Sequence, residues 1–102
     1  GHSITAFLAE DRRVVPKKTS NKDLWPLWVD FAKEKMDFLA LTGAHVNFRG
    51  VIMFQGPSDG NSTYAPHYET HLRRLIEDGR AYFGKPNLNW LQVRSPYWAG
   101  GY

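Results

Sequence analysis

The chain has 102 residues, of which 42% are hydrophobic, 15% are aromatic and 23% are charged. This length and composition indicate one globular domain with a single modest core, and they exclude a disordered tail. The absence of cysteine excludes a disulfide scaffold, a zinc finger with cysteine ligands and a thiol nucleophile. No apolar run reaches the roughly 18 residues that a membrane-spanning helix requires, so no membrane partner is expected. No secretory signal is recognised, and an intracellular location is favoured while the compartment stays unknown.

The formal net charge of +3 lies in the N-terminal segment. Residues 1–22 contain five basic and two acidic side chains, whereas basic and acidic side chains balance in residues 23–102. We therefore divide the chain into a basic N-terminal arm, residues 1–22, and a single folded domain, residues 23–102. Residues 1–2, Gly-His, resemble the remnant of an expression tag.

The first elements in chain order are a short apolar segment and a long helix. Residues 4–9 are apolar and predict either a strand or one helical turn, because so short a run has no decisive periodicity. Residues 10–22 contain Pro16 and predict a loop. Residues 21–41 predict a helix that ends near Gly43. Its apolar arc is wide, which indicates that the helix is covered on more than one face.

Residues 44–55 predict a β-hairpin whose tip is Arg49-Gly50. Alternation along the second half of this hairpin places Val51 and Met53 on a core face and Ile52 and Phe54 on the other face. This second face is a candidate binding surface.

The remaining chain alternates between loops and two further elements. Residues 56–65 are rich in Gly, Ser, Asp and Asn, which predicts a loop. Pro66 can open a helix that ends near Gly79, and residues 80–86 predict a turn. Residues 88–94 alternate and predict a last strand, followed by an irregular aromatic tail.

These elements predict an α+β fold, in which a small antiparallel sheet has two helices on one face. If residues 4–9 form a strand, the order matches the ferredoxin-like, split βαβ arrangement. The alternative is a winged-helix-like fold, although that fold requires a third helix. In the ferredoxin-like arrangement the second face of the sheet would be free to bind a partner.

Basic and aromatic side chains are the first candidates for a functional site. Clustered Lys and Arg neutralise phosphates, and aromatic rings on an open sheet stack on unpaired bases. The candidate nucleic-acid contacts are the arm residues Arg12, Arg13, Lys17 and Lys18 together with Arg49, Phe54, Trp90 and Arg94 of the body. The alternative interpretation is a solvated arm beside aromatic residues that fill the core.

Catalytic and metal-binding patterns are weak by comparison. His67 and His71 lie four residues apart, a spacing that can chelate a metal on one helix face, but no HExxH motif accompanies them. Ser58 and Asp59 could be combined with His67 into a triad, yet nothing in their spacing favours it. We therefore expect no catalytic residues, no metal and no cofactor, and we favour a non-catalytic role while an enzyme with a metal at the two histidines stays open.

The sequence thus favours a non-catalytic nucleic-acid-binding domain of a larger protein, with DNA and RNA both open as targets. The alternative is a protein–protein interaction or oligomerisation domain, because Trp and Tyr are abundant and both residue types dominate interface hot spots. In that case the first helix would dock through Leu27, Phe31 and Phe38. The partner would be another protein or the rest of the parent chain.

Overall fold

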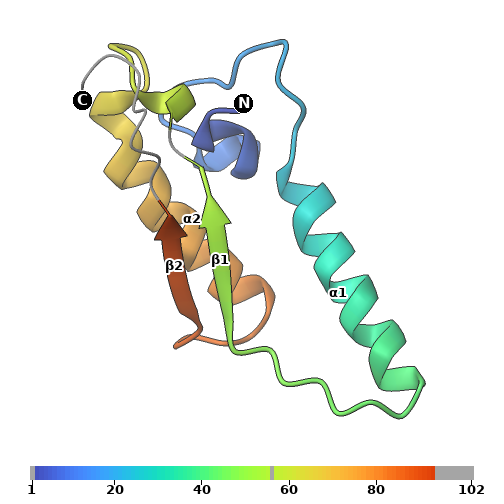
Figure 1. Ribbon diagram of the computed structural model, residues 1–102. Coiled ribbons are helices and arrows are strands. Elements are labelled where there is room, and N and C mark those ends of the chain that lie inside the picture. The colour runs from blue at the N-terminus through green and yellow to red at the C-terminus, as the bar shows by residue number, and fades with distance from the viewer. Residues whose placement is uncertain (1, 56, 94–102) are drawn as a thin grey trace.

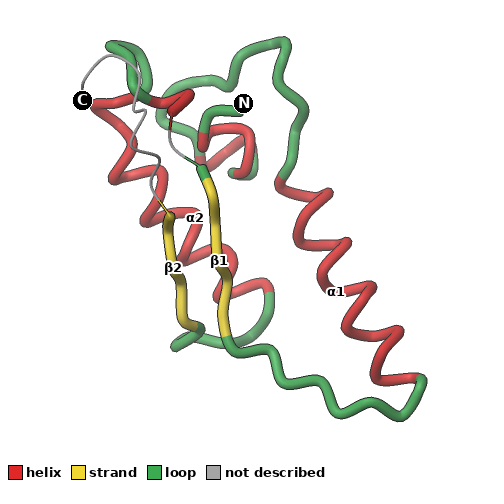
Figure 2. Tube along the Cα trace, viewed as in Figure 1, coloured by secondary structure: helices red, strands yellow, loops and turns green. Residues whose placement is uncertain are grey.

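A computed structural model describes residues 2–55 and 57–93 (Figures 1 and 2). Two α-helices and two β-strands dominate these residues, which confirms an α+β fold. In chain order they are α1 (Trp25–Leu41), β1 (Gly50–Phe54), α2 (Tyr68–Tyr82) and β2 (Asn89–Val93). Short 3₁₀ helices occur at Ile4–Phe7 and Glu10–Arg12 before α1, and at Pro57–Asp59 and Ala65–His67 before α2.

The two strands pair in parallel, with Gly50 opposite Asn89 and Phe54 opposite Val93. The expectation of an antiparallel sheet is therefore wrong. Helix α2 connects the end of β1 to the start of β2, and this long crossover returns the chain to the same end of the sheet. The described residues contain two strands, so neither the ferredoxin-like nor the winged-helix arrangement is established.

The expected hairpin of residues 44–55 is also wrong, because its first half is not a strand. Gly50 does not form a turn tip; it begins β1 and contacts the partner strand closely. A Cβ atom at this position would lie 3.0 Å from the carbonyl oxygen of Asn89. Glycine at position 50 therefore allows the two strands to pair closely. It is not needed there for a positive φ angle, because the glycines with positive φ in the described part of the chain are Gly43 and Gly84.

Both helices form where periodicity predicted them, with shifted boundaries. Helix α1 begins at Trp25 rather than at residue 21, since Pro26 is tolerated only in the first turn. It ends before Gly43, whose φ of +87° matches the predicted stop. Helix α2 continues past Gly79 to Tyr82.

Gly79 has a packing role instead of a terminating one. The ring of Trp90 on β2 passes so close that a Cβ at position 79 would lie 3.0 Å from its Cζ3 atom. The indole of Trp28 on α1 lies 3.5 Å from the same Cβ position, with ring centroids of the two tryptophans 6.2 Å apart. The two helices therefore meet on the face of the sheet that Trp90 occupies.

The N-terminal segment supplies the centre of the core. Residues 4–7 form a 3₁₀ helix rather than a strand, and Ile4 and Leu8 are fully buried beside Leu75 of α2. The backbone N–H of Leu24 donates to the carbonyl of Ala6 at 2.7 Å and so ties the entry of α1 to this segment.

Candidate functional site

The arm residue Arg12 lies along α2 and is engaged in ion pairs. Its Nη2 is 3.0 Å from Glu77 Oε2, and its Nε is 3.1 Å from Asp78 Oδ2. The guanidinium of Arg74 donates to the carbonyl of Arg12, and the N–H of Val14 donates to a buried imidazole of α2. These contacts attach the basic segment to the body of the protein.

Arg13 is more completely enclosed, with its side chain 7% exposed. It donates to the carbonyls of Thr5 and Leu8 at 2.7 and 2.9 Å, and to Asp23 at 2.9 Å. Both arginines thus organise the arm, which reduces the charge they can offer to a phosphate. Their proposed role in nucleic-acid binding stays a prediction.

The two candidate lysines differ in their surroundings. Lys17 donates to the carbonyl of Asn21 at 2.7 Å. Lys18 is exposed, and its ammonium forms no ion pair with any described residue. Lys18 is therefore the most available of the four cations predicted in the arm.

The candidate residues of the body do not gather on one surface. Phe54 is 78% exposed on one side of the sheet, whereas Trp90 is half-buried on the opposite side against Trp28. Arg49 is exposed just before β1, where its guanidinium reaches the side-chain oxygen of Asn47 at 3.0 and 3.1 Å. Arg94 lies outside the described residues.

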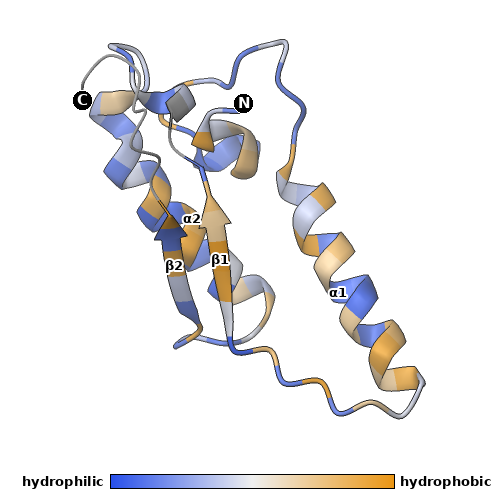
Figure 3. Ribbon diagram, viewed as in Figure 1, coloured by the Kyte–Doolittle hydropathy of each residue, from blue (hydrophilic) through white to orange (hydrophobic). Residues whose placement is uncertain are grey.

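The outer face of the β1–β2 sheet is apolar and open. Val51 and Met53 point inward as alternation predicted, while Ile52 and Phe54 point outward at 64% and 78% exposure. Leu91 on β2 is opposite Ile52 in the register and is 58% exposed. Figures 1 and 3 show α2 behind the strands and no described element in front of them. We call this surface, made by Ile52, Phe54 and Leu91, the open sheet face.

The open sheet face is hollowed near the start of the strands. A depression of about 290 Å³ is lined by Arg49, by residues Gly50 to Ile52 of β1 and by residues Asn89 to Leu91 of β2. All-parallel sheets occur almost only with both faces covered, because their crossover helices pack on them. Among the described residues no element covers this apolar face, which is unusual for a parallel strand pair.

Helix α1 has a second exposed apolar surface. Within α1 only Val29 is fully buried, and the outward side chains follow one face of the helix. We call this surface the α1 stripe; its apolar members are Leu27, Phe31, Phe38 and Leu41, all more than half exposed. No helix of the described residues has both the length and the apolar run needed to cross a bilayer.

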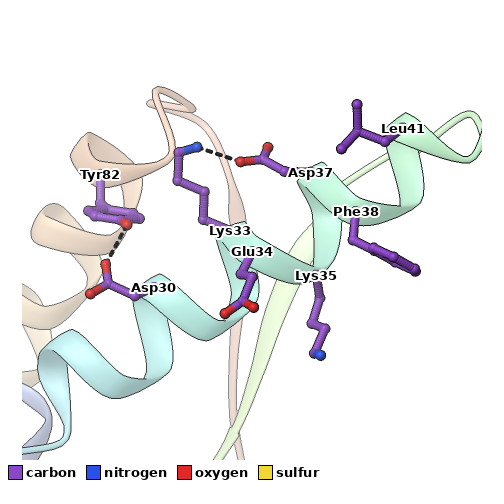
Figure 4. Close-up of a pocket in the computed structure, with 8 residues that line it drawn as sticks. All are labelled: Asp30, Lys33, Glu34, Lys35, Asp37, Phe38, Leu41 and Tyr82. Carbon is purple, nitrogen blue, oxygen red and sulfur yellow. Dashed lines mark hydrogen bonds and ion pairs between the residues drawn. The ribbon is translucent and has the colours of Figure 1, made fainter.

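The two sides of α1 differ in chemistry (Figure 4). Asp30 accepts a hydrogen bond from Tyr82 at 2.7 Å, which raises the pKa of the phenol, and Lys33 pairs with Asp37. Glu34 and Phe38 project away from this polar contact. Glu34 interrupts the α1 stripe and forms no ion pair with a described residue.

A buried polar cluster lies at the carboxyl end of β1. Asp59 is fully buried and accepts from Ser3 Oγ at 2.7 Å, from the N–H of Ile4 at 2.9 Å, and from Gln55 Nε2. Gln92 near the end of β2 donates to the carbonyl of Gln55 at 2.9 Å. Ligands of open α/β sheets bind at this edge, but here the polar groups bind one another and fasten the N-terminal segment to the sheet.

Sequence reasoning missed this cluster, since it joins side chains more than fifty residues apart. A local signal existed only in Asp59, a carboxylate between breaker residues, and that pattern predicts a loop. The triad drawn with Ser58 and His67 has no support in the contacts of Asp59, which point to Ser3 and Gln55 instead.

The two histidines that the sequence offered as metal ligands lie in different elements, since His67 ends the 3₁₀ helix Ala65–His67 and His71 lies within α2. His71 is fully buried, and its Nε2 accepts from the N–H of Val14 at 2.9 Å. Burial lowers the pKa of His71, with smaller contributions from His67 and Arg74 that are opposed by Asp59. Among residues 2–55 and 57–93, no three His, Asp or Glu side chains are grouped to hold a metal ion.

Comparison of the chain with protein-family models, with curated proteins and with solved structures found no match.

Proposed function

We propose that this chain is a protein-association module whose open sheet face binds the apolar face of an amphipathic helix of a polypeptide partner. The observation that carries the proposal is a parallel strand pair that the described residues cover on one face only. Helices are the elements that cover such faces in α/β proteins. This is the interaction alternative of the sequence analysis, moved from the first helix to the sheet.

The energetics favour covering this face. Ile52, Phe54 and Leu91 are each more than half exposed. Burial of one large apolar side chain contributes about 1.5–3 kcal/mol relative to leaving it in water. Three neighbouring side chains can therefore supply several kcal/mol to association, and the contribution does not depend on salt because it does not arise from charge.

Fluorescence anisotropy with a labelled amphipathic helical peptide of Leu, Ala, Lys and Glu tests this proposal. The control is a peptide of the same composition whose apolar residues do not share a face. We expect the amphipathic peptide to bind at least about tenfold more tightly, a difference of about 1.4 kcal/mol. Binding should change little with salt.

Matched variants locate the binding surface. The double substitution Ile52→Lys and Leu91→Lys should abolish the preference for the amphipathic peptide. Val14→Lys is the control, because Val14 is 43% exposed but lies in the arm. Equal binding of the two peptides to the unmodified chain would overturn the proposal.

Nucleic-acid binding is a second candidate, supported by the exposed ring of Phe54 and by exposed Lys18, Lys22 and Arg49. We propose that these residues would contact a single strand, with Arg12 and Arg13 occupied by their protein partners. Three neutralised phosphates predict a slope of log K against log salt near −2 for a single strand and near −2.7 for a duplex. Anisotropy with labelled RNA and DNA measures it, and absence of binding at low salt would remove this candidate.

A further inference from the structure

We infer that the partner helix is α1 of a second copy of this chain, so that two copies cover each other's open sheet faces. The inference rests on the proposed function and names the occupant of the sheet face. Within residues 2–55 and 57–93 one chain carries both surfaces: a sheet face that no described helix covers and a helix face that no described strand covers.

The two surfaces agree in length. The α1 stripe extends from Leu27 to Leu41, which is about 21 Å at the rise of an α-helix. Strands β1 and β2 have five residues each, which is about 16 Å of extended chain. The helix stripe is thus long enough to cover the whole exposed length of the sheet.

The two surfaces also carry complementary charges. Glu34 is the acidic residue within the α1 stripe, and it has no described ionic partner. Arg49 lies at the edge of the depression in the open sheet face, and its described partner is the neutral side chain of Asn47. A helix laid on this face can bring Glu34 of one copy to Arg49 of the other. Such a pair selects the partner and its orientation more than it adds affinity.

The exposed area agrees with an unfilled interface. The chain exposes 6674 Å², whereas a compact monomer of this size exposes about 5,900 Å². The excess is roughly 800 Å², which is comparable to the area that each partner buries in a standard protein–protein interface. The radius of gyration, 14.8 Å, also exceeds the value of about 13 Å for a compact domain of this length.

A two-fold arrangement closes the assembly at two copies. In an isologous dimer each copy gives one helix and receives one, so both open sheet faces are covered and no unmatched surface is left to recruit a third chain. Two Glu34–Arg49 contacts would form, one on each side of the axis.

Sedimentation velocity of the whole chain tests the inference, over concentrations on the order of 1 to 100 µM, the range that populates interfaces of modest affinity. We expect a monomer–dimer equilibrium. Glu34→Arg and Arg49→Glu should each raise the dimer dissociation constant about tenfold, since each brings like charges together. Combining both substitutions should restore dimerisation to within about threefold of the unmodified chain, because the pair is re-formed with its signs exchanged.

Control reversals are placed at exposed charges away from both surfaces, Asp11→Arg and Lys18→Glu, and they should leave the dissociation constant unchanged. Phe31→Asp in the α1 stripe should abolish the dimer, with circular dichroism confirming that the variant is folded. A chain that stays monomeric throughout, or a double reversal that is no better than the single ones, overturns the inference. A monomer that still prefers the amphipathic peptide would leave the proposed function standing, which separates the two failures.

Discussion

At the scale of single residues, buried polar groups decide how the N-terminal segment is held. Asp59 accepts hydrogen bonds from Ser3, Ile4 and Gln55 while fully buried. Asp59→Ala leaves these donors without an acceptor, so we expect the free energy of unfolding to fall by about 3 kcal/mol in urea denaturation. Asp11→Ala, at an exposed position, should change it by less than about 0.5 kcal/mol. Equal effects of the two substitutions would show that the cluster does not stabilise the fold.

The imidazole of His71 predicts a pH dependence at the same scale. Because burial lowers the pKa of His71, the unfolded chain binds a proton at higher pH than the folded chain. Its contribution to stability is complete above about pH 6.5, the ordinary pKa of histidine, and is lost progressively as the pH falls below that value. Protonated Nε2 could no longer accept from the N–H of Val14.

Urea denaturation at several pH values measures this effect. We expect the free energy of unfolding to decline between about pH 6.5 and pH 5, and the decline to be smaller in His71→Gln, which cannot titrate. Parallel profiles for the two proteins would contradict the assignment.

At the scale of elements, the contact between α2 and β2 depends on Gly79. A Cβ at this position would lie 3.0 Å from the ring of Trp90 and 3.5 Å from the ring of Trp28. Gly79→Val should therefore lower the free energy of unfolding by about 1–3 kcal/mol through overpacking. Ala81→Val, on the exposed side of the same helix, should cost only about 0.6 kcal/mol of helix propensity. Thermal denaturation of both variants checks the difference. Equal losses of stability would show that the ring of Trp90 moves aside without cost.

The two helices should also differ in local stability. Helix α1 has one fully buried residue, whereas α2 buries His71, Leu75 and Gly79. Backbone amide hydrogens exchange with solvent through local unfolding where a segment has few buried apolar contacts. We expect hydrogen exchange in residues 36–41 to be faster than in residues 71–79. Similar protection of the two segments in the monomer would show that the outer half of α1 is better supported than its contacts indicate.

At the scale of the whole molecule, uncovered apolar surface links stability to association. If the open sheet face is covered only in an assembly, binding stabilises the folded state by mass action. The Tm should rise with protein concentration, and the Ile52→Lys and Leu91→Lys double variant should lack this rise. Differential scanning calorimetry at low and high concentration measures it. A Tm that is independent of concentration in both proteins would argue against self-association.

Local patterns predicted much of the secondary structure. The apolar periodicity identified both helices, Gly43 marked the end of α1, and alternation placed Ile52 and Phe54 on the outer face. Such features depend on neighbours within a few residues, which the sequence displays directly. The candidate site was harder to predict, because the same alternation did not reveal that Trp90 would pack against Trp28 and Gly79 on the inner face.

The sequence by itself determined the α+β class, the positions of the helices and the location of the net charge. Only the tertiary structure decided that β1 pairs with β2 in parallel, and that Arg12 holds the arm against α2. The physical reason is the range of the interactions. Propensity and periodicity act over one or two turns of the chain. Strand direction and ion-pair partners depend instead on contacts between residues about forty or more positions apart. No local pattern encodes which of these distant residues come together when the chain between them forms a loop.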